Sequence, residues 1–312
     1  MAGYPFWRET DTYPPMRNKI LGVALVLAGA SCYGVLSVFI KTAYTRGYTP
    51  SEILISQFSV AIVLLAVIEA IRRRKPVARV EPLTALRLVA GGTAIGLVGI
   101  FYYLTIQYSS VSAAIVLLMQ SVWIGLAGES LRRRRWPSAT QLVPAILVVA
   151  GSLLATNVLG GAVAFTPLGL FYGLVAATCY TGSIWVSDTV GTGVHPLPRS
   201  LLMVVGGAAI ALPQAVPHLL EKFDPGVLWP WSVLAAVLGT IAPQYLLNRG
   251  VPLTGIALAT ILTSVELPVS VIMAQLVLGE AFSGLQWVGV AVILFAIALA
   301  NARPAPRMAV IA

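Results

Sequence analysis

The sequence predicts an all-α integral membrane protein with ten transmembrane helices, arranged as two inverted five-helix repeats around a central cavity. Three observations support this fold: an apolar composition, ten apolar segments separated by short breaks, and a pattern that recurs in the second half. Hydrophobic residues make up 58% of the 312 residues and charged residues only 10%, whereas a soluble domain carries about 25% charged residues. The composition therefore excludes a soluble protein.

The ten apolar segments are each close to the roughly 20 residues that cross a bilayer as a helix. Charged or Pro/Gly-rich breaks separate them, and no break is long enough for a separate soluble domain. We expect a leader at residues 1–18, a first repeat at 19–158, a second repeat at 159–303 and a tail at 304–312. The predicted spans are residues 20–40, 52–71, 86–107, 111–131, 139–157, 167–187, 199–217, 230–249, 256–278 and 284–302.

Basic residues gather on one side of these spans. With the N-terminus in the cytoplasm, 17 of the 20 Lys and Arg residues fall in cytoplasmic segments, including the runs 72–75 and 132–135. Cytoplasmic loops of membrane proteins carry such an excess. The pattern predicts a multi-pass protein of the bacterial inner membrane with both termini in the cytoplasm. Because each basic run directly follows an apolar span, it indicates topology, and no nucleic-acid partner is expected.

The two halves share a series of collinear matches. At an offset of 147 residues, Ser31-Cys32-Tyr33 meets Thr178-Cys179-Tyr180, and Lys41 meets Asp188. At an offset of 145 residues, Ser138 and Gln141 meet Ser283 and Gln286. With five spans in each half, the second half enters the membrane from the opposite side. Inverted repeats of this kind are a device of secondary transporters, in which two halves expose one midplane site to each side in turn.

Several segments of the second half carry a family pattern. They are Tyr245–Gly250, Glu266-Leu267-Pro268, Leu278-Gly279-Glu280 and Leu285–Gly289. In these segments the chain resembles the EamA type of the drug/metabolite transporter superfamily. The first half departs from the pattern, because Arg135 stands where the repeat would place Glu280. The resemblance, which is nearest to bacterial amino-acid exporters, implies a helical basket around a central cavity. It also implies export of amino acids or other small metabolites.

Polar side chains inside predicted spans give the candidate binding residues, because such groups are costly in lipid and usually face protein or water. Glu266 is the only carboxylate near the middle of a span, and Thr263 and Ser270 share its helix face. Pro268 removes one backbone hydrogen bond beside it. We expect Glu266 to contact a substrate ammonium group or a coupling proton. The predicted substrate-binding residues are Tyr33, Ser37, Tyr102, Tyr103, Gln120, Trp123, Tyr180, Trp185, Gln244, Tyr245, Asn248, Thr263 and Glu266.

Structural roles remain open for many of these residues. The amides of Gln120, Gln244 and Asn248 can tie helices together, and the aromatic rings can pack or form an interfacial belt. Glycines at positions 92, 96 and 99 share one helix face and predict close helix contact. Lys41 and Asp188 are interpreted as solvated helix ends, with a gate on each side as the alternative. Glu69 and Glu129 are interpreted as exposed partners of the arginines that follow them.

Other function classes lack the residues they need. The two histidines, His195 and His218, fall near loops, so no midplane Ser–His pair or histidine metal cluster can be assembled. No P-loop is present, so ATP is not the direct energy source. We expect no cofactor, no metal and no enzyme activity, with a channel as a further alternative. The expected partners are a small-molecule substrate and membrane lipid, and the oligomeric state is left open.

Overall fold

The computed structural model describes residues 16–72, 80–109, 111–158, 165–221 and 223–302, and it is helical almost throughout these ranges. Eight helical stretches within them are long and apolar enough to cross a membrane, which confirms an all-helical membrane fold. The elements are α1 Met16–Thr45, α2 Pro50–Arg72, α3 Pro82–Tyr108, α4 Val111–Leu118, α5 Ser121–Arg133, α6 Ala139–Ala155, α7 Pro167–Thr189, α8 Pro196–Glu221, η2 Pro225–Leu228, α9 Trp231–Ala236, η3 Val237–Ile241, α10 Ala242–Thr254, α11 Ile256–Thr263, α12 Glu266–Leu278 and α13 Gly284–Ala302.

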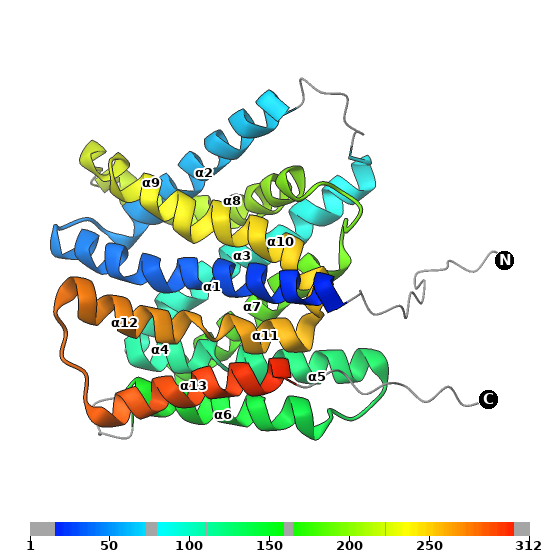
Figure 1. Ribbon diagram of the computed structural model, residues 1–312. Helices are drawn as coiled ribbons and strands as arrows, with labels where there is room; N and C mark the ends of the chain where they lie inside the picture. Colours follow the sequence, from blue (N-terminus) through cyan, green and yellow to red (C-terminus); the bar gives the residue numbers. More distant parts are fainter. Residues whose placement is uncertain (1–15, 73–79, 110, 159–164, 222, 303–312) are drawn as a thin grey trace.

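The helices form one elongated bundle (Figure 1). α1 lies between α10 and α12, and α6 packs against α13 along one edge of the bundle. The start of α1 and the end of α13 lie at the same end of the bundle. The α5–α7 ion pair described below marks this same end, which we call the arginine-rich end. The opposite end holds the α1–α2 connection and the α12–α13 connection.

Two of the membrane-length stretches are interrupted near their middle. The first divides into α4 and α5 at residues 119–120, and the second into α11 and α12 at residues 264–265. In both cases a helix of 8 residues precedes a helix of 13 residues. The second interruption has a covalent cause, because Pro268 has no N–H to donate to Ser264 O. The N–H of Leu267 donates to that oxygen instead, at 3.2 Å.

The helices that follow these stretches begin in the same way. Before α6, Gln141 Oε1 accepts a hydrogen bond from the backbone N–H of Ser138 at 3.2 Å. Before α13, Gln286 Oε1 accepts one from the backbone N–H of Ser283 at 2.9 Å. Each pair satisfies an N–H group that the start of a helix leaves without a partner. The matched Ser and Gln residues therefore perform one structural task at corresponding places in the two halves.

Two of the three glycines on the predicted face of α3, Gly92 and Gly96, make the close helix contact that the sequence predicts, whereas a side chain at Gly99 would meet only Leu54, at 3.7 Å. A side chain at Gly92 would meet the backbone of Met203, and one at Gly96 would meet the backbone of Gly207. From the other side, a side chain at Gly206 would meet the backbone of Val89. α3 and α8 therefore touch backbone to backbone over two turns. This contact holds α3 in place and so sets the direction of its aromatic residues.

Two acidic residues differ from the prediction that they are exposed. Glu69 is only 4% exposed and binds the guanidinium of Arg72 through two hydrogen bonds of 2.8 Å. Glu129 is 6% exposed and accepts a hydrogen bond from the backbone N–H of Ala257 at 2.5 Å. The second contact explains the burial of Glu129, because its carboxylate caps the N-terminus of α11, where a negative charge is favourable.

Candidate functional site

A single carboxyl group lies among phenol groups in the interior of the bundle. Glu266 is the first residue of α12, directly after the break from α11. Its carboxyl group interacts electrostatically with the phenols of Tyr33 in α1, Tyr102 in α3 and Tyr180 in α7. Thr263, the last residue of α11, lies beside Tyr180. We call these five residues the Glu266 cluster, and they bring together five of the thirteen predicted site residues from five helices.

The polar groups of the Glu266 cluster are incompletely satisfied by the protein. The Glu266 carboxyl makes no hydrogen bond or ion pair with another side chain in the described ranges, and it is partly exposed. Tyr33 and Tyr102 are also partly exposed. The hydroxyl of Tyr180 is buried, and Thr263 lies beside it without a hydrogen bond of ordinary geometry among the described residues. Buried polar groups normally have partners, so this cluster has donors and an acceptor to offer a ligand.

The polar face continues one turn along α1 and α12. Ser37 follows Tyr33 by four residues, and its hydroxyl lies 2.7 Å from the hydroxyl of Ser270. Gly34 permits the contact, because a side chain there would meet the Val269 side chain at 2.8 Å. Predicted residue Ser37 therefore joins α1 to α12 beside the cluster.

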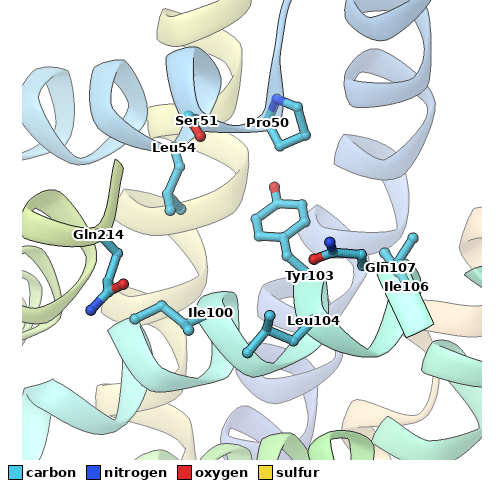
Figure 2. A pocket seen from close by; sticks show the side chains of 9 residues that line it. All are labelled: Pro50, Ser51, Leu54, Ile100, Tyr103, Leu104, Ile106, Gln107 and Gln214. Atoms are coloured by element: carbon cyan, nitrogen blue, oxygen red, sulfur yellow. The ribbon is translucent and has the colours of Figure 1, made fainter. Parts of the chain in front are cut away.

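Tyr103 faces a different space from Tyr102. Its hydroxyl lies 3.3 Å from the hydroxyl of Tyr44, which ties α3 to α1. Its ring lines a pocket of about 390 Å³ between α2, α3 and α8 (Figure 2). None of the five residues of the Glu266 cluster lines this pocket. Its lining residues are Pro50, Ser51, Leu54, Ile100, Tyr103, Leu104, Ile106, Gln107 and Gln214.

The predicted pair at the first break is bonded locally. Gln120 donates its amide N–H to Val116 O at 3.0 Å, a carbonyl near the end of α4. Its amide oxygen accepts a hydrogen bond from Trp123 Nε1 at 2.8 Å. Trp123 is 48% exposed and shares a face of α5 with the exposed Ala127 and Leu131. The structure therefore does not place this pair with the Glu266 cluster.

The amides on α10 contact α8. Gln244 donates to Met203 Sδ at 3.3 Å, and Asn248 Nδ2 donates to Ser200 Oγ at 3.0 Å. The backbone oxygen of Asn248 also accepts a hydrogen bond from Arg199 at 2.7 Å. These contacts correspond to the helix-tying role that the sequence left open. Of the atoms of these two amides, only Oδ1 of Asn248 is buried without a partner among the described residues.

The fully buried Arg199 organises the arginine-rich end. Besides Asn248 O, its guanidinium donates to the carbonyl oxygens of Val186, Ser187 and Val190 at 3.0, 2.6 and 2.8 Å. These three carbonyls lie at the end of α7, where a helix leaves C=O groups without partners. Arg199 thus caps α7 and joins it to α8 and α10.

The two remaining predicted residues are aromatic residues of α7 and α10. Trp185 packs against Gly128, where a side chain would lie 2.7 Å from its ring, and Arg132 lies over the Trp185 ring at 5.9 Å. Tyr245 packs against a separate group of buried residues that includes Phe58 and Val204. Both rings therefore pack between helices.

Two ion pairs occupy opposite ends of the bundle. Lys41, in the last turns of α1, pairs with Glu280, just beyond α12. Asp188, at the end of α7, pairs with Arg132 in α5, with an N–O distance of 3.4 Å. The Asp188 side chain is only 12% exposed, so the expectation that it is a solvated helix end is wrong, whereas the Lys41 side chain is 58% exposed, as expected for a solvated helix end. Glu280 and Arg132 were not predicted from the sequence as their partners. A signal was present, because the repeat-related positions carry opposite charges: Lys41 corresponds to Asp188, and Glu280 corresponds to Arg135.

The helical fold, the interrupted helices and the incompletely paired carboxyl group are features of membrane transporters. The chain belongs to the EamA-like transporter family, whose model matches residues 20–157 and 167–302. This confirms the family resemblance predicted from the sequence, within the drug/metabolite transporter superfamily. Because the family and a relative are both named as transporters, the chain is assigned as a transporter.

Two individual proteins illustrate the similarity. The chain is 24% identical over 296 residues to the uncharacterized transporter YcbK of Bacillus subtilis (strain 168), a match that covers 90% of this chain and 93% of that protein. A solved crystal structure superposes with a TM-score of 0.74 at 15% identity, covering 93% of this chain and 98% of that chain. At this identity the structure supports the fold alone.

Proposed function

We propose that the protein is an alternating-access secondary transporter that exports amino acids, aromatic ones included, and related small metabolites across the bacterial inner membrane. The observation that carries this proposal is the Glu266 cluster, in which a carboxyl group without a side-chain partner among the described residues lies among three phenols. A carboxylate binds an ammonium group by a charge-assisted hydrogen bond. The faces of the tyrosine rings attract a cation and pack well against an aromatic side chain.

The position of the carboxyl group also supports transport. Many secondary transporters bind substrate near the midplane at interrupted helices, and Glu266 lies directly after such an interruption. Intramembrane ionisable residues commonly mark a substrate or proton pathway. We propose that Ser37 and Tyr103 contribute to the pathway beside the cluster. The substrate roles of Gln120, Trp123, Trp185, Gln244, Tyr245 and Asn248 stay predictions.

Several correspondences between the halves support the proposed inverted repeat of ten spans. α4 and α5 have the lengths of α11 and α12, and the same Ser and Gln pair precedes α6 and α13. The family model matches one segment in each half. The ion pairs Lys41–Glu280 and Asp188–Arg132 lie at opposite ends of the bundle, as gates on the two sides of the membrane would. With the arginine-rich end in the cytoplasm, both termini are cytoplasmic.

A transporter of cationic drugs or cationic metabolites is the second candidate. The described neighbours of Glu266 in the cluster are phenols and a threonine, and no basic side chain stands among them. A solute with a single positive charge could therefore pair with the Glu266 carboxylate. The carboxylate of an amino acid would have only hydroxyl donors in the cluster. This observation favours testing cations beside zwitterions.

The experiment is counterflow into proteoliposomes preloaded with the unlabelled solute, without an imposed ion gradient. Labelled threonine, methionine, phenylalanine and tryptophan represent the amino acids, and labelled tryptamine represents the cations. Transient accumulation of amino acids that saturates and is competed by other amino acids supports the first proposal. Accumulation of tryptamine alone supports the second. If no labelled solute accumulates with or without a pH gradient, both proposals fail.

A further inference from the structure

The pocket between α2, α3 and α8 is a second space in the bundle, lined by apolar and uncharged polar residues. It lies at the end that holds the Lys41–Glu280 ion pair, because the first residue of α2, Pro50, lines it together with Gln107 near the end of α3. Tyr103 in the pocket and Tyr102 in the Glu266 cluster are neighbours in sequence but point to different sides of α3. The pocket is therefore close to the cluster and separate from it.

Three hydrogen-bonding side chains of the pocket have no side-chain hydrogen bond with another residue in the ranges that the structure covers. They are Ser51, Gln107 and Gln214. Figure 2 shows Gln214 on one side of the space, Tyr103 and Gln107 on the other, and Ser51 with Leu54 along a third side. Two primary amides and two hydroxyls thus border one space, and the amides offer both donors and acceptors.

The rest of the lining is apolar, and none of the lining residues is charged. An ion in this pocket would lose water without gaining an opposite charge, which is unfavourable. An apolar body with uncharged donors and acceptors would instead match both parts of the wall. The volume of about 390 Å³ lies in the range of small-molecule sites.

We propose that this pocket is a binding site for small amphipathic solutes that carry several hydrogen-bonding groups and no net charge. It adds a site to the Glu266 cluster and does not depend on what that cluster binds or on whether transport occurs. Tyr103 and the two glutamines select the solute by hydrogen bonds, while Leu54, Ile100 and Leu104 hold its apolar part.

The test is equilibrium dialysis of tritiated N-acetyl-L-tryptophanamide against the full chain in phospholipid nanodiscs. Tryptamine and indole-3-acetate carry the same ring with a positive or a negative charge. We expect saturable binding of the neutral probe and at least tenfold weaker competition by either ion, because the pocket offers no counter-charge. No saturable binding in nanodiscs, with binding in detergent only, would mean that lipid chains fill the space and would overturn the proposal.

Variants locate the bound probe. Gln107→Leu and Gln214→Leu should each weaken binding by about five- to tenfold, the effect of one lost hydrogen bond. Gln275→Leu, at an exposed glutamine of α12 outside the pocket, should leave binding unchanged. Tyr103→Phe removes a single oxygen and tests the same wall if a leucine variant does not fold. Unchanged binding in the pocket variants, or a loss caused by Glu266→Gln instead, would place the probe elsewhere and refute the site.

Discussion

The two interrupted helices have the same lengths and different chemistry. At the first break, Gln120 bonds to Val116 O and to Trp123, so the polar groups exposed by the break are used within the segment itself. At the second break, Pro268 removes a donor, and Glu266 presents a carboxyl group without a side-chain partner in the described chain. The first break is closed on itself, and the second is open to a ligand.

Helices of matching length in the two halves can therefore differ in function. The first break satisfies its own polar groups, whereas the second supplies the carboxyl group of the candidate site. The two ion pairs also differ between the halves. The repeat-related residues Lys41 and Asp188 carry opposite charges, so each binds a partner of the other sign.

Replacing the carboxyl group should have the largest effect. Glu266→Gln keeps the size of the side chain and removes its charge, so counterflow of a bound amine should fall at least about tenfold, since a hydrogen bond to a charged group contributes about 1.5–3 kcal/mol. The exposed Glu81→Gln serves as the matched control. Unchanged transport with an unchanged pH dependence would remove Glu266 from the mechanism.

Reversing the charges of the ion pairs should have an intermediate effect. Lys41→Glu alone and Asp188→Lys alone each place like charges together, and we expect exchange to slow several-fold. Lys41→Glu combined with Glu280→Lys, and Asp188→Lys combined with Arg132→Glu, should restore most of the exchange rate. If the double variants are as slow as the single ones, the pairs are not gates, and the comparison between the two ends loses its functional meaning.

Removing the amide at the first break should lower stability more than transport. Gln120→Leu leaves Val116 O and Trp123 Nε1 without their partner, and we expect a loss of about 1 kcal/mol. Thermal unfolding in detergent measures the loss, and counterflow measures KM. A raised KM with unchanged stability would show that Gln120 binds substrate, as the sequence also allowed, and that the two breaks are more alike than their bonds indicate.

A small pH effect is expected at the start of α8. His195 Nδ1 accepts a hydrogen bond from the backbone N–H of Leu197 at 3.2 Å, and burial together with nearby Arg72 lowers the pKa of His195 below 6.5. The neutral form therefore stabilises the fold above that value, and the contribution is lost as the pH falls through the lowered pKa. The melting temperature should fall slightly on acidification. His195→Asn, which keeps a capping acceptor that does not titrate, should remove that part of the fall.

The sequence predicts the chemistry of the second break well, because its signals are local. Spacing alone puts Glu266 and Ser270 on one helix face, with Thr263 just before the break, and the repeat relates Tyr33 to Tyr180. The partners of Gln244 and Asn248 were not predictable, because Met203 and Ser200 lie on a helix whose position depends on the whole bundle. The burial of Glu129 had the same cause. Its arginine neighbours in sequence indicate solvent, and Arg133 does pair with it at 2.8 Å, but its second contact is the start of α11, 128 residues away.

The buried guanidinium of Arg199 has a consequence for how the chain enters the membrane. Three of its four carbonyl partners lie at the end of α7, within 13 residues of it, and the fourth, Asn248 O, comes 49 residues later. During synthesis, the hairpin of α7 and α8 can therefore insert with its charge already largely satisfied, before α10 has left the ribosome. Arg199→Leu would remove these hydrogen bonds between α7 and α8. The orientation of the hairpin would then depend on contacts with helices that are synthesised later.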